Sequence, residues 1–122
     1  MPTSKRIEEF IRQVETNKHV EAVEAFYTED ASIQENNSTP RIGRAKLVQR
    51  EREVMKKAKS IYSQCIRPFF EDDNLVIIRW KFRFDWLDGT VTEIEEIAYQ
   101  RWDQDRIAEE KFFYDPTQLQ PK

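Results

Sequence analysis

Three polar residues, Glu96, Gln100 and Glu110, lie among bulky apolar side chains near the C-terminus. They fall in a stretch from Val91 to Pro116 whose composition predicts two β-strands joined by a tight turn. Alternate side chains of a strand point to opposite faces, and all three residues have even numbers. They therefore share a face with Ile94, Ala98, Trp102, Phe112 and Tyr114. Carboxylates on an apolar sheet face are typical of a small-molecule pocket.

Glu51 is a second acid in an apolar setting, within a helix predicted from about Arg44 to Lys59. The apolar stripe of this helix consists of Leu47, Val54, Met55 and Ala58, with Val48 at its edge. At ~100° per residue, Glu51 falls in the middle of that stripe. Two interpretations stay open. Either Glu51 adds a carboxylate to the pocket, or it lies at a helix end or pairs with an arginine such as Arg44.

Glu110, Glu96 and Glu51 are the candidate catalytic residues. Burial raises the pKa of a carboxyl group, and a like-charged neighbour raises the pKa of one member of a pair further. A pair that shares a proton would supply one acid and one base near neutral pH. Reactions served by such a pair include proton abstraction next to a carbonyl, isomerisation, aldol-type ring closure, and addition or elimination of water.

The remaining candidates are ligand-binding residues. Tyr27 and Gln100 could donate hydrogen bonds to an oxyanion. The expected apolar walls and pocket end are Trp80, Phe82, Trp102, Phe112 and Tyr114. An alternative interpretation is that these aromatic residues form an ordinary core, because one sheet face must be buried anyway. In that case Glu96 and Glu110 would be tied by arginines or by backbone donors.

The elements that position these residues follow from periodicity and turn signals. Thr3 and Ser4 can cap a first helix, whose apolar stripe is Ile7, Phe10, Ile11 and Val14. A second helix is predicted from about His19 to Thr28, and a short strand from Ala31 to Gln34. After the third helix come strands at roughly 60–70 and 75–86, and then the 91–116 hairpin. Helices covering one face of a meander of about four strands form an α+β fold.

The two hairpin turns, WLDGT (86–90) and WDQDR (102–106), look alike. A three-residue loop closed by a left-handed residue suits both, with Gly89 and Asp105 in that position. The resulting pairs are Trp86 with Thr90, Phe82 with Ile94, Trp80 with Glu96, Trp102 with Arg106, and Ala98 with both Ile78 and Glu110. Lys81 then faces Glu95 and Arg83 faces Glu93, as opposite charges. This register sets Glu110 diagonally across from Glu96 and Gln100.

Composition excludes several classes of function. A net charge of -3 over 122 residues, with no basic stripe, argues against nucleic-acid binding. No apolar run is long enough for a membrane span, and the single cysteine, Cys65, leaves no internal disulfide, so we expect a cytoplasmic protein. The single histidine, His19, is expected at a helix start or on the surface, outside the pocket. Three Glu could hold a hard cation, but no ligand spacing supports a metal site, and no cofactor is expected.

Several segments of this chain, in their order, resemble the NTF2-like superfamily, in particular its SnoaL-like, polyketide-cyclase-like proteins. The resemblance rests on FYTEDASIQEN (26–36), PRIGR (40–44), LVQRERE (47–53) and EEIAYQRWDQDRIAEEKFFYDP (95–116). It implies one domain over residues 1–122: a cone-shaped α+β barrel of three N-terminal helices packed on a curved, mainly antiparallel sheet. It also implies a homodimer through the outer sheet face. The superfamily includes isomerases, cyclases, dehydratases, epoxide hydrolases and silent binding proteins, so fold does not settle function.

Two functions are compatible with these residues. The first is a cofactor-independent acid/base isomerase, cyclase or hydratase/dehydratase that acts on a small hydrophobic carbonyl-type compound. The second is a non-catalytic small-ligand-binding or dimerisation module. An open cavity lined by at least two of the three acids would favour the first. A filled interior, with each Glu paired to an arginine, would favour the second.

Overall fold

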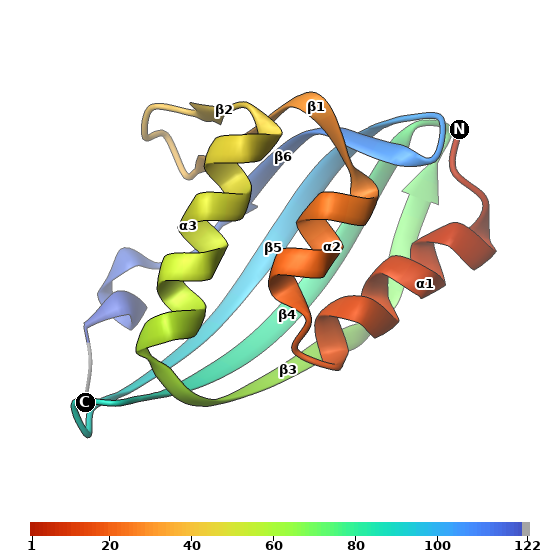
Figure 1. Ribbon diagram of the computed structural model, residues 1–122. Coiled ribbons are helices and arrows are strands. Elements are labelled where there is room, and N and C mark those ends of the chain that lie inside the picture. The colour runs from red at the N-terminus through yellow and green to blue at the C-terminus, as the bar shows by residue number, and fades with distance from the viewer. Residues whose placement is uncertain (121–122) are drawn as a thin grey trace.

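Three helices cover one face of a curved six-stranded sheet (Figure 1). The structure, a computed structural model, describes residues 1–120, so the last two residues of the expected domain lie outside it. The helices are α1 (Ser4–Glu15), α2 (His19–Phe26) and α3 (Arg44–Lys57), with a short 3-10 helix η1 (Pro116–Leu119). The strands are β1 (Tyr27–Glu35), β2 (Arg41–Ile42), β3 (Ala58–Asp72), β4 (Leu75–Trp86), β5 (Val91–Asp103) and β6 (Arg106–Phe113).

The sheet has the strand order β2-β1-β6-β5-β4-β3. Strands β3 to β6 form the predicted antiparallel meander, and the sheet is open rather than closed into a full barrel. The exception to antiparallel pairing is β1, which lies parallel to β6. The predicted α+β cone, with three helices on a mainly antiparallel sheet, is thereby confirmed.

Helix α1 packs its predicted apolar stripe on the sheet. Thr3 caps the helix by accepting a hydrogen bond from the Arg6 backbone N–H at 3.0 Å. Ile7, Phe10 and Ile11 are buried. The ring of Phe10 contacts the two tryptophans on the inner sheet face, with centroids 6.4 Å from Trp80 and 6.1 Å from Trp102. These edge-to-face contacts fix the helix over the sheet.

Helix α2 ends at Phe26, two residues before the predicted end, because the chain there joins the sheet. Tyr27 is already extended and pairs with Ile107 of β6. Its carbonyl accepts hydrogen bonds from Arg44 at 3.0 Å and Arg106 at 3.2 Å. The predicted strand at 31–34 is therefore part of the longer β1. Strand β2 was not predicted, because no pattern in the sequence indicates it.

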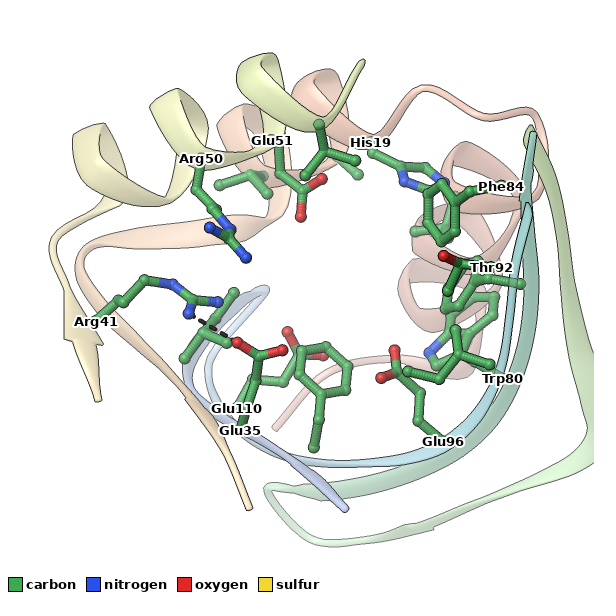
Figure 2. A pocket seen from close by; sticks show the side chains of 18 of the residues that line it. His19, Glu35, Arg41, Arg50, Glu51, Trp80, Phe84, Thr92, Glu96 and Glu110 are labelled. Atoms are coloured by element: carbon green, nitrogen blue, oxygen red, sulfur yellow. Dashed lines mark hydrogen bonds and ion pairs between the residues drawn. The ribbon is translucent and has the colours of Figure 1, made fainter. Parts of the chain in front are cut away.

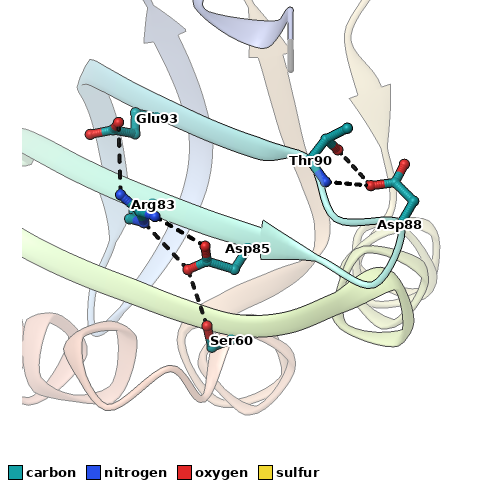
Figure 3. Close-up of polar contacts among 6 residues, drawn as sticks. All are labelled: Ser60, Arg83, Asp85, Asp88, Thr90 and Glu93. Carbon is teal, nitrogen blue, oxygen red and sulfur yellow. Dashed lines mark hydrogen bonds and ion pairs between the residues drawn. The ribbon is translucent and has the colours of Figure 1, made fainter. Parts of the chain in front are cut away.

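The register predicted for the β4–β5 hairpin is confirmed. Trp86 donates its N–H to the Thr90 carbonyl at 2.9 Å, and Trp80 lies opposite Glu96. On the outer face, Arg83 reaches both Asp85 (3.1 Å) and Glu93 (4.0 Å), as Figure 3 shows. In the turn, Asp88 accepts from the backbone and the hydroxyl of Thr90 (Figure 3).

The register predicted for the β5–β6 hairpin is wrong. Asp103 pairs with Arg106 across a two-residue loop, and Gln104 (φ 58°) takes the left-handed position expected for Asp105. A bulge at Ala108 then shifts the ladder, because Arg101 pairs with Glu109 while Trp102 pairs with Ile107. Glu110 therefore lies directly opposite Gln100, and Ala98 lies opposite Phe112.

The two turns allow a paired test of backbone strain. Gly89 (φ 88°) has no atom within 4 Å of a Cβ built on it, so Gly89→Ala probes the left-handed conformation alone. We expect Gly89→Ala to lower the free energy of unfolding by about 1 kcal/mol. Gln104→Gly should raise it by up to about 1 kcal/mol, because glycine relieves the same strain. Urea unfolding measures both changes. If the two substitutions change the free energy of unfolding in the same direction, the turn assignments are contradicted.

Candidate functional site

A cavity of about 280 Å³ lies between the helices and the inner face of the sheet (Figure 2). One wall is a ladder of aromatic side chains on β4: Trp80, Phe82, Phe84 and Trp86. Neighbouring rings are 5.0 to 6.1 Å apart between centroids. The other walls carry four glutamates, Glu35, Glu51, Glu96 and Glu110. Figure 2 shows acids from separate walls pointing into one space, so charged groups meet a largely apolar surface.

Glu110 is the deepest of these acids, with 3% of its surface exposed. Its Oε1 accepts a short hydrogen bond from the Tyr27 hydroxyl, and its Oε2 accepts from the Gln100 amide at 2.6 Å. Burial raises the pKa of Glu110 to about 7, although both hydrogen bonds lower it. The carboxyl group is therefore fixed in place and titrates near neutral pH.

Glu96 occupies a different environment on β5. Unlike Glu110, it has no side-chain hydrogen bond or ion pair to any of residues 1–120. Burial and, to a smaller extent, the nearby carboxylates, Glu110 first, together raise the pKa of Glu96 to about 8. The Glu96 carboxyl group lines the cavity and is therefore mostly protonated there at neutral pH.

Glu51 reaches the cavity from α3, where Leu47 and Val48 one turn earlier are buried. Burial raises the pKa of Glu51, against the lowering effect of Arg50 and Arg41. The pairing with Arg44 that the sequence left open does not form, because Arg44 donates to the Tyr27 carbonyl instead. Within the described residues, then, no arginine or lysine lies within ion-pair distance of Glu51, Glu96 or Glu110.

Glu35 lines the cavity but was not among the predicted residues. It pairs with Arg41 at 2.7 Å and accepts from the Tyr114 hydroxyl at 2.9 Å. Burial raises the pKa of Glu35, but these contacts outweigh burial and hold the pKa below its ordinary value. The alternation of β1 could have revealed it, because Ala31 and Ile33, four and two residues earlier, are both buried.

His19 corrects a further expectation, because it lines the cavity and is only 9% exposed. Its Nε2 lies 2.9 Å from the Ser63 hydroxyl, and its ring packs edge-on against Phe82 at 5.6 Å. Burial lowers the pKa of His19, because the charged ring loses its hydration in this position. The expected helix start is confirmed, because His19 is the first residue of α2. The expected position outside the pocket is wrong, because contacts from β3 and β4 bury the ring.

The predicted ligand-binding residues divide into two groups. Tyr27, Trp80, Phe82 and Phe112 line the cavity. Outside its lining lie Gln100, Trp102 and Tyr114. The Trp102 indole N–H donates to the side-chain oxygen Oε1 of Gln100 at 3.0 Å, and Tyr114 donates to Glu35. Tyr27 and Gln100, expected as oxyanion donors, both donate to Glu110 instead.

Two features are absent from residues 1–120, a metal-ligand cluster and a membrane-spanning helix. No cluster of three or more His, Cys, Asp or Glu side chains has the arrangement of a metal site. None of the described helices is long and apolar enough to cross a membrane.

The fold and the cavity together define a class: an α+β cone that carries an acid-lined internal cavity. The chain belongs to the family of SnoaL-like domains, whose model matches residues 7–110. No curated protein matches the sequence significantly.

Solved structures share this fold at low sequence identity. An NTF2-like protein of unknown function from Burkholderia pseudomallei superposes with a TM-score of 0.78 and 11% identity, over 94% of this chain and 92% of that one. An LEH-like epoxide hydrolase from M. tuberculosis gives 0.77 and 13%, over 94% and 84%. A putative SnoaL-like polyketide cyclase from Mesorhizobium loti gives 0.75 and 15%, over 91% and 97%. At such identities the likeness shows the fold alone.

The raised pKa of Glu96 predicts a pH-dependent stability. The folded protein holds the Glu96 proton more tightly than the unfolded chain does, since the folded pKa is about 8 against an ordinary 4.5. The bound proton therefore adds to the free energy of unfolding. This stabilisation is fully present below the ordinary pKa and is lost as pH rises through the folded pKa. Between about pH 5 and about pH 9, Glu96→Gln should therefore gain on the order of 1–3 kcal/mol relative to the wild type.

Urea unfolding across this pH range measures the effect. The matched control is Glu95→Gln, which removes the neighbouring carboxylate on the exposed outer face, where Glu95 pairs with Arg79. If the free energy of unfolding of Glu96→Gln differs from that of the wild type by the same amount at every pH, the raised pKa of Glu96 is contradicted.

Proposed function

We propose that the protein is a cofactor-independent acid/base enzyme, an isomerase, cyclase or hydratase/dehydratase that acts on a small hydrophobic carbonyl-type compound. The observation that carries the proposal is the cavity itself. Glu51, Glu96 and Glu110 all line it, and none of them pairs with a basic side chain of the described residues. Unpaired, partly buried carboxyl groups with raised pKa values are common at catalytic sites.

Glu110 is the proposed base. With a pKa of about 7, a large fraction of the group is ionised at neutral pH. The hydrogen bonds from Tyr27 and Gln100 hold both oxygens in position. Each carboxylate oxygen has two lone pairs, so an oxygen that accepts one such bond can still accept a proton from substrate. A base fixed in this way needs little reorganisation when the reaction begins.

Glu96 is the proposed acid, because its pKa of about 8 keeps it protonated. The sequence raised the hypothesis that a pair of these acids shares a proton, but no hydrogen bond joins Glu96 and Glu110. Gln100, the partner of Glu110, lies four positions along β5 from Glu96, a backbone separation of about 13 Å. A substrate placed between the two groups can thus meet an acid on one side and a base on the other.

The chemistry follows from these positions. Glu110 takes a proton from a carbon next to the carbonyl, and the Glu96 proton moves to the carbonyl oxygen, which gives a neutral enol. Return of a proton from Glu110 to another carbon, as Glu96 recovers its own proton, yields an isomer. The aromatic ladder on β4 binds the apolar part of the substrate and limits the access of water. A volume of about 280 Å³ limits the substrate to a small molecule.

A specific observation favours the second candidate, a non-catalytic ligand-binding module. Both oxygens of Glu110 are already hydrogen-bonded, and the group is almost fully buried. Such a carboxylate could serve to join β1, β5 and β6. In that case a ligand would bind in the cavity without proton exchange.

The assembly and location of the protein stay predictions. We propose one domain, a homodimer through the outer sheet face, and a cytoplasmic location. The support for the dimer is a set of exposed apolar side chains on the outer face of the sheet: Tyr62, Ile77, Ile97, Tyr99 and Phe113.

Proton exchange in heavy water tests the proposed chemistry directly. We expect the wild type to catalyse deuterium incorporation next to the carbonyl of at least one member of a panel of cyclic ketones and lactones, followed by NMR. Glu110→Gln should abolish this exchange, by a factor of roughly a hundred or more, without loss of the fold. The matched control is Glu109→Gln, an exposed neighbour on the same strand. If Glu110→Gln unfolds the protein, Glu110 is structural and the assignment fails.

The rate of exchange should depend on pH in a bell-shaped manner. The rising limb reports ionisation of Glu110, with a pKa of about 7, and the falling limb reports loss of the Glu96 proton, with a pKa of about 8. Glu96→Gln should remove the falling limb and lower the maximum, because the amide donates no proton to the carbonyl oxygen. A rate that is independent of pH in the neutral range would exclude these roles.

A further inference from the structure

The cavity has two chemically different ends. The Trp80, Phe82 and Phe84 rings of the β4 ladder form one end, and the other carries the guanidinium groups of Arg50 from α3 and Arg41 from β2. Figure 2 shows both arginines reaching into the cavity from the side opposite Phe84 and Trp80. A ligand that fills the cavity therefore meets cationic donors at one end and aromatic rings at the other.

The two arginines differ in how their donors are used. Arg41 is paired with Glu35 at 2.7 Å, but its buried Nε–H has no hydrogen-bond partner. Arg50 makes no ion pair or side-chain hydrogen bond within residues 1–120, although Arg52, two residues further along α3, pairs with Glu24. An unsatisfied buried donor is costly, and a free guanidinium is a ready binding site for a planar anion.

The carboxylate of Glu35 limits the negative charge that this end can accept. Glu35 already neutralises Arg41, so Arg50 is the guanidinium of this end without an ion pair within residues 1–120. Glu51 also faces this end, where burial raises its pKa and Arg50 and Arg41 lower it. A doubly charged anion would be repelled by Glu35. A carboxylate has one charge and the planar shape that suits a guanidinium.

Arg50 also lies where a charged group can stay hydrated. A second hollow, lined by Lys56, Lys57 and the 86–90 turn, adjoins the cavity and shares Arg50, Val54 and Trp86 with it. A carboxylate at Arg50 would thus keep contact with water at the mouth. This position lowers the desolvation cost that a fully buried anion would meet.

We propose that the ligand of this cavity is a small monocarboxylate with a flat, unsaturated apolar body, held by Arg50 at one end and by the β4 ladder at the other. This inference rests on the proposed function, because it names the substrate class of the same site. Arg50 positions the ligand so that its middle lies between Glu96 and Glu110. The reacting carbon and the carboxylate are consequently at different places on the molecule.

Isothermal titration with trans-cinnamate and trans-cinnamamide tests the proposal, because the two probes have nearly the same shape and differ in charge. We expect the wild type to bind cinnamate at least about tenfold more tightly than the amide. Arg50→Gln should remove this difference, and Arg50→Lys should keep part of it. Arg52→Gln, which removes one charge from the same helix outside the cavity, should leave the preference unchanged.

Three results would overturn the proposal: equal binding of the two probes, a preference that survives Arg50→Gln in a folded variant, or no binding of either probe at millimolar concentration. Far-ultraviolet circular dichroism confirms that each variant is folded. The binding test is independent of catalysis. If the wild type prefers cinnamate but catalyses no ketone exchange, the proposed enzyme is contradicted and the anion site is supported. If it catalyses the exchange but has no preference for cinnamate, the anion site alone is contradicted.

Discussion

The cavity depends on the hydrogen bonds that hold the buried carboxyl group of Glu110. Tyr27 and Gln100 donate to its two oxygens, and Trp102 in turn donates to the side-chain oxygen of Gln100. These residues come from β1, β5 and β6, so the polar chain joins three neighbouring strands at the base of the cavity. Without these donors, burial of a carboxyl group at this place would cost several kcal/mol, on the order of the stability of a whole domain. The same contacts fix the position of the proposed base.

Glu96 shows how the same residue type acquires another role from its surroundings. Both groups are desolvated, but only Glu110 receives hydrogen bonds that favour its ionised form. The pKa of Glu96 is consequently the higher of the two. Two glutamates on neighbouring strands can therefore act as acid and base without a metal or histidine partner in the proposed reaction. The aromatic ladder contributes by keeping both groups in a poorly solvated space.

Local sequence signals predicted the elements and the faces of the strands well. The alternation in β4 and the opposite charges on its outer face specified the β4–β5 register, and Gly89 marked the left-handed turn residue. The β5–β6 register failed because nothing in the sequence marks the bulge at Ala108. The loop is one residue shorter than predicted and the bulge adds one residue. Beyond the bulge, even-numbered residues of β5 therefore still pair with even-numbered residues of β6. Glu110 was hence assigned to the correct face but to the wrong partner.

The charged surroundings of the acids were harder to predict than the acids themselves. His19, Glu35, Arg41 and Arg50 enter the cavity through contacts between segments that lie far apart in the chain. The bend from α2 into β1 at Tyr27, for example, depends on arginines at positions 44 and 106. Periodicity within one segment carries no information about such partners. It identifies which side of an element faces inward, but not which charges meet there.

The central claim is that two carboxyl groups of the cavity retain protons close to neutral pH. A carbon-13 NMR titration of the glutamate side chains, assigned with single Glu→Gln substitutions, measures this property without a substrate. The account predicts that Glu110 titrates with a pKa of about 7 and Glu96 with a pKa of about 8. Titration of both groups near the ordinary value of 4.5 would contradict it.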